Sequence, residues 1–143
     1  MGFIDGARED GARIAQGGRR PAHLDRGWYV EPTVVTEVTP GMRIAREEVF
    51  GPVLSVIEYA GEDEAIAIAN DTVYGLGAGI FSADAERAAL LARRVRAGTV
   101  NINRHITDFC LPFGGFKQSG IGREGGPEAI SSYLETKVIG PHA

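Results

Sequence analysis

Residues 53–102 read VLSVIEYAGEDEAIAIANDTVYGLGAGIFSADAERAALLARRVRAGTVNI, and their apolar pattern predicts the fold. Three short runs in this stretch are typical of β-strands: residues 53–59, 78–81 and 99–102. The first run is apolar enough to predict a strand buried on both faces. Two helix-like segments separate the three runs. Strands that alternate with helices at this spacing predict an α/β fold with parallel strands.

The two helices in this stretch are expected to have different end signals. The first, over residues 62–70, has three acidic residues in its first turn, where negative charge suits the helix dipole. The second is expected to have Ser82 as its N-cap and to run through Ala97. The arginines within residues 93–96 suit its negatively polarised end, and Gly98 is expected to terminate it.

The residues before this stretch predict one further helix and one further strand. Small or apolar residues at positions 4, 7, 11 and 14 predict an amphipathic helix over residues 2–16, ended by Gly17 and Gly18. A polar loop over residues 19–31 follows. The β-branched run at residues 33–38 then predicts a strand.

The residues after this stretch predict a long loop and a short C-terminal region. The loop covers residues 103–126, and connections of this length without secondary structure usually carry function. A helical stretch from Pro127 and a last extended run over residues 134–139 are expected to follow.

Composition excludes several classes of protein. A chain of 143 residues has room for one domain with a hydrophobic core. The net charge of −4, without a basic tract, disfavours nucleic acid as a partner. No apolar run approaches the ~20 residues that cross a bilayer, and the N-terminus lacks a hydrophobic signal segment, so a cytoplasmic location is expected. The single cysteine, Cys110, excludes an internal disulfide and an all-cysteine metal site.

A glycine-rich motif near the C-terminus suggests a dinucleotide-binding turn but does not meet its requirements. Residues 120–125, GIGREG, match the pattern G-x-G-x-x-G. The fingerprint needs a strand immediately before it and an acidic residue about 20 positions later. Residues 116–119 do not have the pattern of a strand, and too few residues follow. We therefore interpret these glycines as turn and packing residues.

Cys110 has two neighbours of the kind found in catalytic triads, His105 and Asp108. Such groups normally come from distant segments, and three within one short loop rarely reach the required geometry. We therefore favour a packing or pocket-lining role for this thiol over a nucleophilic one. His23, His105 and His142 have no metal-ligand spacing among themselves or with the cysteine, so no metal site is expected.

Residues 47–53, EEVFGPV, place two carboxylates next to an aromatic residue and a buried run. Adjacent side chains diverge on a strand or a helix, so Glu47 and Glu48 cannot share a proton as a dyad. Two interpretations stay open from the pattern alone. Both acids are solvated at a turn with Phe50 in the core, or one acid points into a site.

Four motifs in this order resemble the C-terminal part of the NAD(P)-dependent aldehyde dehydrogenase superfamily. They are EEVFGPV at residues 47–53, NDTVYGL at 70–76, AGTVNIN at 97–103 and PFGGFKQSGIGRE at 112–124. The sequence YLETK at residues 133–137 is similar to the last strand of that family. The resemblance covers essentially the whole chain, and it implies a partial catalytic domain of that family with an α/β fold.

The resemblance implies a cofactor role for two residues of EEVFGPV. In the family, the second glutamate of the motif accepts hydrogen bonds from the nicotinamide ribose, and the aromatic residue two positions later packs beside the nicotinamide. These residues are Glu48 and Phe50 here, while Glu47 is expected to point away. An ionised carboxylate suits a vicinal diol because charge-assisted hydrogen bonds are strong. The implied cofactor is NAD or NADP, bound weakly or not at all by this chain alone.

The long loop resembles the family's substrate tunnel, so Phe109, Cys110 and Phe113 are implied to line the path of an aldehyde. Aromatic residues suit an apolar aldehyde tail. The family oxidises aldehydes to carboxylic acids through a cysteine thiohemiacetal. Its nucleophilic cysteine, its general-base glutamate and its dinucleotide-binding domain precede EEVFGPV by more than the residues present here. Cys110 lies on the wrong side of the motif to replace that cysteine.

The chain is therefore expected to correspond to about the last third of such an enzyme, and to be inactive alone. Residues 1–133 would form the C-terminal part of the catalytic domain, and residues 134–143 the terminal oligomerisation strand and tail. The alternative is a non-catalytic module that binds full-length relatives or forms a homo-oligomer. Its contact residues would be Leu134, Glu135, Thr136, Lys137, Val138 and Ile139.

Overall fold

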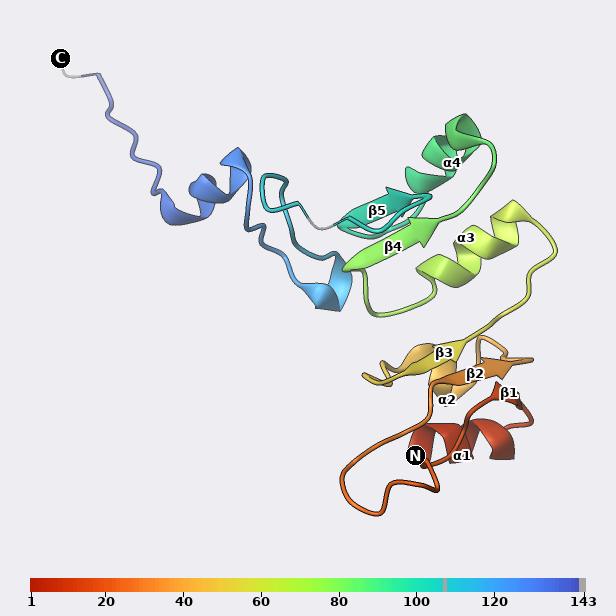
Figure 1. Ribbon diagram of the computed structural model, residues 1–143. Helices are drawn as coiled ribbons and strands as arrows, with labels where there is room; N and C mark the ends of the chain where they lie inside the picture. The colour runs from red at the N-terminus through yellow and green to blue at the C-terminus, as the bar shows by residue number, and fades with distance from the viewer. Residues whose placement is uncertain (107, 142–143) are drawn as a thin grey trace. The chain divides into compact units, whose positions relative to one another are not determined.

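The computed structural model describes residues 1–106 and 108–141, and it forms two compact units (Figure 1). The first unit is Met1–Asp71 and the second is Thr72–Ala143. Each unit combines helices with a small sheet, so the predicted α/β class is confirmed. The boundary expected between residues 133 and 134 stays a prediction.

The first unit contains three helices and a three-stranded sheet. The elements are α1 (Gly2–Glu9), β1 (Arg13–Gln16), β2 (Thr33–Thr36), α2 (Arg43–Arg46), β3 (Val53–Ser55) and α3 (Glu62–Asn70). The sheet order is β1-β2-β3, with β1 antiparallel and β3 parallel to β2. The strand predicted at residues 33–38 and the helix predicted at 62–70 are thus present, the helix with the expected bounds.

The helix predicted over residues 2–16 is wrong in its second half. The helix α1 ends at Glu9, and Gly11 takes a left-handed φ of 95° that redirects the chain. Residues 13–16 then pair with β2, with Ile14 opposite Val35. Of the apolar or small positions behind the prediction, 4 and 7 therefore belong to α1, whereas 14 belongs to β1. Gly17 and Gly18 follow a strand rather than a helix.

The core of the first unit lies where α1, α2 and β2 meet. Its buried cluster consists of Ala7, Ala12, Val35, Val38 and Ile44. The partly buried side chains of Val49 and Val53 pack against this cluster. The segment that joins α2 to β3 is therefore attached to the core at defined points.

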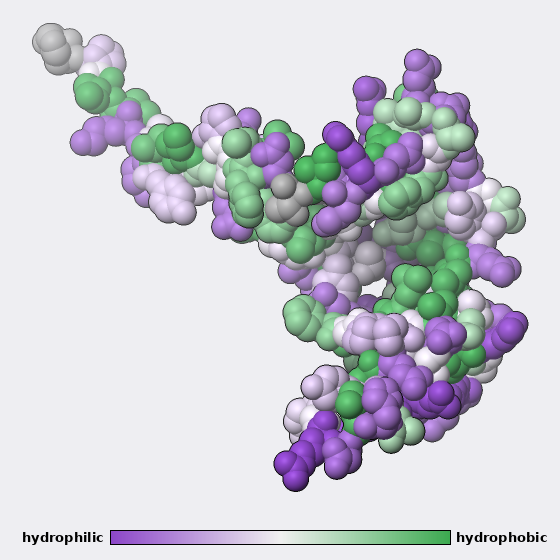
Figure 2. Space-filling view, viewed as in Figure 1, coloured by the Kyte–Doolittle hydropathy of each residue, from purple (hydrophilic) through white to green (hydrophobic). Residues whose placement is uncertain are grey.

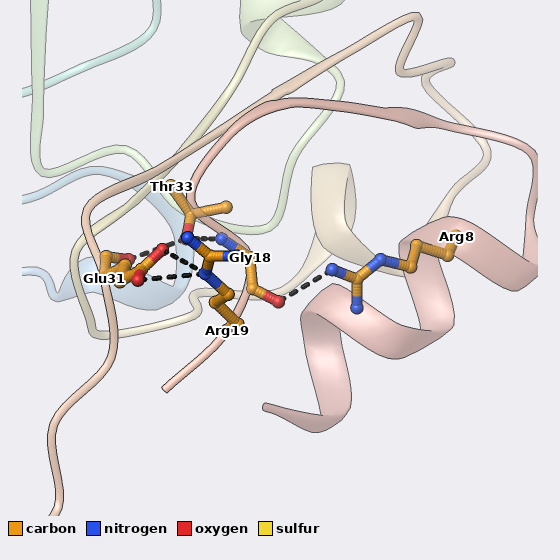
Figure 3. Close-up of polar contacts among 5 residues, drawn as sticks. All are labelled: Arg8, Gly18, Arg19, Glu31 and Thr33. Carbon is orange, nitrogen blue, oxygen red and sulfur yellow. Dashed lines mark hydrogen bonds and ion pairs between the residues drawn. The ribbon is translucent and has the colours of Figure 1, made fainter. Parts of the chain in front are cut away.

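A polar clasp closes the loop at residues 19–31 (Figure 3). The buried hydroxyl of Thr33 accepts from the Gly18 amide at 2.9 Å and donates to the Glu31 carbonyl at 2.7 Å. Arg8 donates to the Gly18 carbonyl at 2.7 Å, and Arg19 donates to both carboxylate oxygens of Glu31. The loop itself forms no helix or strand, as its polar composition predicted.

The strand β3 is shorter and more exposed than its sequence predicts. Only Val53–Ser55 is a strand, and the Leu54 side chain is 61% exposed. Within the two described ranges, β3 pairs only with β2 and forms an edge of the sheet. The prediction of burial on both faces is therefore wrong for this chain.

The second unit contains a parallel β-α-β element: β4 (Gly77–Ile80), α4 (Ala85–Ala92) and β5 (Thr99–Ile102). The two strands pair in parallel with Gly77 opposite Thr99 and Ile80 opposite Ile102. Parallel strands need a crossover connection, and α4 provides it. The predicted alternation is confirmed here, whereas β3 and β4 lie in different sheets.

Both predicted ends of α4 are wrong. The N-cap is Asp84, whose carboxylate accepts from the Arg87 amide at 2.8 Å, and the Ser82 hydroxyl instead accepts from the Asp84 amide. The helix ends at Ala92, before the arginines of residues 93–96. Gly98 ends no helix, because α4 has already ended at Ala92, and it lies in close contact with Gly114 instead.

The C-terminal half of the second unit has little regular structure. A single antiparallel bridge joins Phe113 to Glu124, and two 3-10 helices follow: η1 (Lys117–Ser119) and η2 (Pro127–Tyr133). The helical stretch predicted from Pro127 is thus present as a 3-10 helix. Residues 134–139 pair with no other described residue as a strand. Within residues 1–106 and 108–141, no helix has the length and apolar character to cross a membrane.

Candidate functional site

EEVFGPV follows α2 directly and leads into β3, and its two carboxylates have different environments. Glu47 lies one turn after Arg43 and accepts two hydrogen bonds from it, from Nε at 3.1 Å and from Nη2 at 3.0 Å. The hydrogen bonds from Arg43 lower the pKa of Glu47, partial desolvation opposes this shift, and the positive charge of Arg43 adds a smaller lowering. Glu47 is therefore paired, not merely solvated as the sequence suggested.

Glu48 is exposed, and its carboxylate makes no hydrogen bond or ion pair with any residue in the described ranges. Its neighbour Val49 turns back towards the core cluster. The side chains thus alternate in direction along this segment: those of residues 47 and 49 are held by other parts of the unit, whereas that of residue 48 projects outward. A charged acceptor held in this way can receive hydroxyl donors from a ligand.

Phe50 has an uncommon backbone conformation for a bulky residue. Its φ is 50°, in the left-handed region, and its side chain is 91% exposed. Such a conformation costs on the order of 1–3 kcal/mol and persists only where the surroundings impose it. The sequence placed Phe50 either in the core or beside a cofactor, and the core alternative is wrong.

Both outward-pointing residues line one hollow of about 570 Å³ in the first unit. The residues that line it are Ile44, Glu47, Glu48, Val49, Phe50, Gly51, Val53 and Ser55. The hollow combines a free carboxylate, an exposed aromatic ring and apolar side chains. These groups fit a ribose with its two hydroxyls and an adjoining flat ring, the chemistry of a nicotinamide riboside.

The three residues expected to line a substrate path lie together in the second unit. Phe109 is 87% exposed, Cys110 is exposed and Phe113 is 45% exposed. A tight turn orders the first two, because the Asp108 carboxylate accepts from the Cys110 amide at 2.9 Å and the Asp108 carbonyl from the Leu111 amide at 3.1 Å. Phe113 is fixed by paired backbone hydrogen bonds with Glu124.

The same turn bears on the possible triad of His105, Asp108 and Cys110. The carboxylate of Asp108 binds the backbone of Cys110, and no hydrogen bond joins it to His105 among the described residues. The groups thus lack the linkage that activates a thiol. Across residues 1–106 and 108–141, no three His, Cys, Asp or Glu side chains are arranged to hold a metal. His142 lies outside the described residues.

Sequence reasoning missed the pairing of Arg43 with Glu47. The signal was present, because a basic and an acidic residue four positions apart on a helix face one another. It was overlooked because α2 is only one turn long and its helical pattern is weak.

Comparison with known proteins gives a consistent result. A sequence model described as the aldehyde dehydrogenase family matches residues 1–139. The chain is 54% identical over 128 residues to a geranial dehydrogenase from Castellaniella defragrans, covering 90% of this chain and 27% of that protein.

Solved structures also resemble it. An aldehyde dehydrogenase from Mycobacterium tuberculosis complexed with NAD+ has a TM-score of 0.89 and 47% identity over 92% of this chain and 27% of its own. A variant of aldehyde dehydrogenase C from Pseudomonas syringae, complexed with NAD+ and octanal, has a TM-score of 0.90 and 50% identity over 95% of this chain and 28% of its own.

The chain spans less than a third of the length of these relatives. The match nevertheless runs over almost all of its own residues, at an identity far above the level that shows a fold alone. The chain therefore belongs to the aldehyde dehydrogenase family.

Proposed function

We propose that this chain is the C-terminal portion of the catalytic domain of an NAD(P)-dependent aldehyde dehydrogenase. The complete enzyme oxidises an aldehyde to a carboxylic acid through a cysteine thiohemiacetal. The nucleophilic cysteine, the general-base glutamate and the dinucleotide-binding domain come from outside this chain. The 143-residue chain alone has no catalytic residue, turns over no aldehyde and binds the cofactor weakly or not at all. The complete enzyme acts in the cytoplasm.

The observation that carries this proposal is the unpaired carboxylate of Glu48 beside the exposed ring of Phe50 on one hollow. Glu48 accepts hydrogen bonds from the two hydroxyls of the nicotinamide ribose. Phe50 forms the wall against which the nicotinamide lies, and the bound cofactor accepts the hydride. Ribose hydroxyls are common to NAD and NADP, so both fit this role.

Phe109, Cys110 and Phe113 line the aldehyde's path in the complete enzyme. Two observations support this assignment: both phenylalanine rings are exposed, and backbone hydrogen bonds hold the loop. Exposed aromatic rings suit an apolar substrate tail. Cys110 serves here as a lining thiol.

The decisive experiment compares Glu48→Gln with Glu58→Gln in the complemented enzyme. The chain is combined with the upstream portion of the 54%-identical relative, and NADH formation is followed by absorbance. Glu48→Gln removes a charged acceptor, so the KM for the cofactor is expected to rise about 10- to 100-fold, as for loss of hydrogen bonds to a charged group. Glu58 is an exposed carboxylate of the same unit outside the hollow.

Glu58→Gln is expected to leave the KM unchanged. The isolated chain provides the baseline and is expected to form no NADH. Equal KM values for the two variants would refute the ribose role of Glu48. Turnover by the isolated chain, abolished by Cys110→Ala, would refute the proposal as a whole.

A second function has its own support in the terminal segment. Residues 134–139 lie in no helix or strand, Leu134 has an extended backbone, and Leu134, Val138 and Ile139 are 67%, 88% and 87% exposed. An extended segment with free backbone groups can add to the edge of another sheet. In this alternative the chain is a non-catalytic module that binds a full-length dehydrogenase subunit or a second copy of itself.

A further inference from the structure

Arg43 contacts two elements of the first unit at once. Its guanidinium donates two hydrogen bonds to the Glu47 carboxylate and lies 4.3 Å from the centroid of the Phe3 ring on α1. A guanidinium held by a bidentate carboxylate and an aromatic face has a better defined orientation than one in a single exposed ion pair. Arg43 thus links α1 to the residue immediately before Glu48.

The segment after α2 is anchored at alternate residues. Glu47 is held by Arg43, and Val49 packs against the core cluster. Glu48 and Phe50, which lie between and after these anchors, are exposed and line the hollow together with the anchors. The left-handed φ of Phe50 requires surroundings that impose it. The two anchors restrain the segment before Phe50, and after it the Pro52 carbonyl accepts from the Thr33 amide at 2.8 Å.

We propose that Arg43 is a positioning residue for the cofactor site: by clasping Glu47, it holds the backbone that presents Glu48 and Phe50 to the ligand. This inference rests on the proposed function of Glu48. It assigns different tasks to the adjacent carboxylates, because Glu47 binds the protein and Glu48 binds the ribose. An ordinary exposed ion pair would contribute a little stability and leave residues 48 and 50 unmoved.

The first test measures conformation in the full 143-residue chain by NMR. In the wild type, the positive φ of Phe50 gives a strong nuclear Overhauser effect between its own amide and α protons. Arg43→Gln is expected to weaken this signal and to shift the amide resonances of residues 47–50. The charge-swapped variant Arg43→Glu/Glu47→Arg is expected to restore part of the signal.

Arg13→Gln is the matched control, because it breaks an exposed ion pair with Glu37, at 3.9 Å, that lies outside this segment. It is expected to leave the Phe50 signal intact. If Arg43→Gln also leaves the Phe50 signal and the Glu48 amide unchanged, the positioning role is wrong.

The second test measures cofactor kinetics in the complemented enzyme. Arg43→Gln is expected to raise the KM for the cofactor about 2- to 5-fold with kcat retained, the scale of an exposed ion pair. The double variant Arg43→Gln/Glu48→Gln is expected to lose less than the two single variants added together in binding free energy, because Arg43 acts in part through Glu48. Additive losses would overturn the inference. If Glu48→Gln has no effect on KM, the proposed function fails instead, and the Phe50 signal separates the two outcomes.

Discussion

Two adjacent glutamates show how far one residue's surroundings can change its chemistry. Glu47 and Glu48 are the same residue type, one position apart, and both are exposed. Glu47 pairs with Arg43, whereas the Glu48 carboxylate forms no hydrogen bond or ion pair within the described ranges. Because neighbouring side chains diverge, Arg43 can pair with one carboxylate while the other stays free at the same hollow. The candidate site therefore rests on Glu48 and Phe50, whose neighbours Glu47 and Val49 are held by the rest of the unit.

The pairing of Glu47 predicts a pH dependence of stability. Arg43 lowers the pKa of Glu47 in the folded chain, so the unfolded chain binds more protons in acid. The contribution of the pair is thus present above the unfolded pKa of Glu47 and is lost as the pH falls through the lower, folded pKa. Glu47→Gln is expected to destabilise the chain at neutral pH but not at a pH of about 2, measured by urea unfolding.

Arg43 keeps its charge at both pH values, since the same pair raises its pKa. The pH dependence of stability therefore reports the protonation of the Glu47 carboxylate alone. A stability difference between wild type and Glu47→Gln that persists unchanged in acid would show that the ion pair is not its cause.

At the scale of elements, the sequence predicts where helices and strands lie better than it predicts which residues cap them or pack between them. The helix α3 and the strand β5 have the predicted bounds, and the crossover between β4 and β5 was expected. The cap of α4 is Asp84 instead of Ser82, two candidates that both carry a suitable oxygen. Only the backbone path decides which side chain meets the free amides of the first turn.

Gly98 provides a test of packing at this scale. A Cβ at this position would collide with the carbonyl oxygen of Gly114, and the Gly98 amide is already bound to the Gly75 carbonyl at 3.0 Å. The Gly98 backbone cannot move away from Gly114 without loss of its hydrogen bond to Gly75. Gly98→Ala is expected to destabilise the chain by about 1–3 kcal/mol, measured by thermal or urea unfolding.

Gly122→Ala is the matched control, because nothing lies within 4 Å of a Cβ built there. It is expected to change the stability by no more than about 0.5 kcal/mol. Equal stabilities for the two variants would show that the segment around Gly114 adapts to the extra methyl group.

At the scale of the whole molecule, many large hydrophobic side chains are exposed. Hydrophobic side chains appear on the surface of both units (Figure 2), among them Leu54 at 61% and Phe81 at 77% exposure. Large exposed apolar patches mark surfaces that other protein covers. The chain spans less than a third of its relatives, which agrees with such uncovered surface.

The terminal segment carries the prediction at this scale. If residues 134–139 add to the sheet of a dehydrogenase subunit, Thr136→Pro/Lys137→Pro removes backbone donors from both of its edges. Co-purification with a full-length aldehyde dehydrogenase subunit is expected for the wild type and is expected to be lost in this variant. Light scattering of the mixture measures the mass of the complex.

Thr136→Ala/Lys137→Ala keeps the backbone donors and is the control, so it is expected to retain the complex. Loss of association in both variants would indicate side-chain contacts in place of strand addition. Absence of any complex with the wild type would exclude the interaction module.

Local patterns in the sequence determined the α/β class, the bounds of α3 and β5, and the order of motifs that identifies the family. These features depend on residues close together in the chain. The tertiary structure decided that residues 13–16 form a strand, that Gly98 packs against Gly114 and that Phe50 stands outside the core. Each of these depends on partners or a backbone path that periodicity does not encode. The pairing of Glu47 with Arg43 is local, since the two residues are four positions apart, whereas the exposure of the unpaired Glu48 beside a hollow is a property of the folded unit.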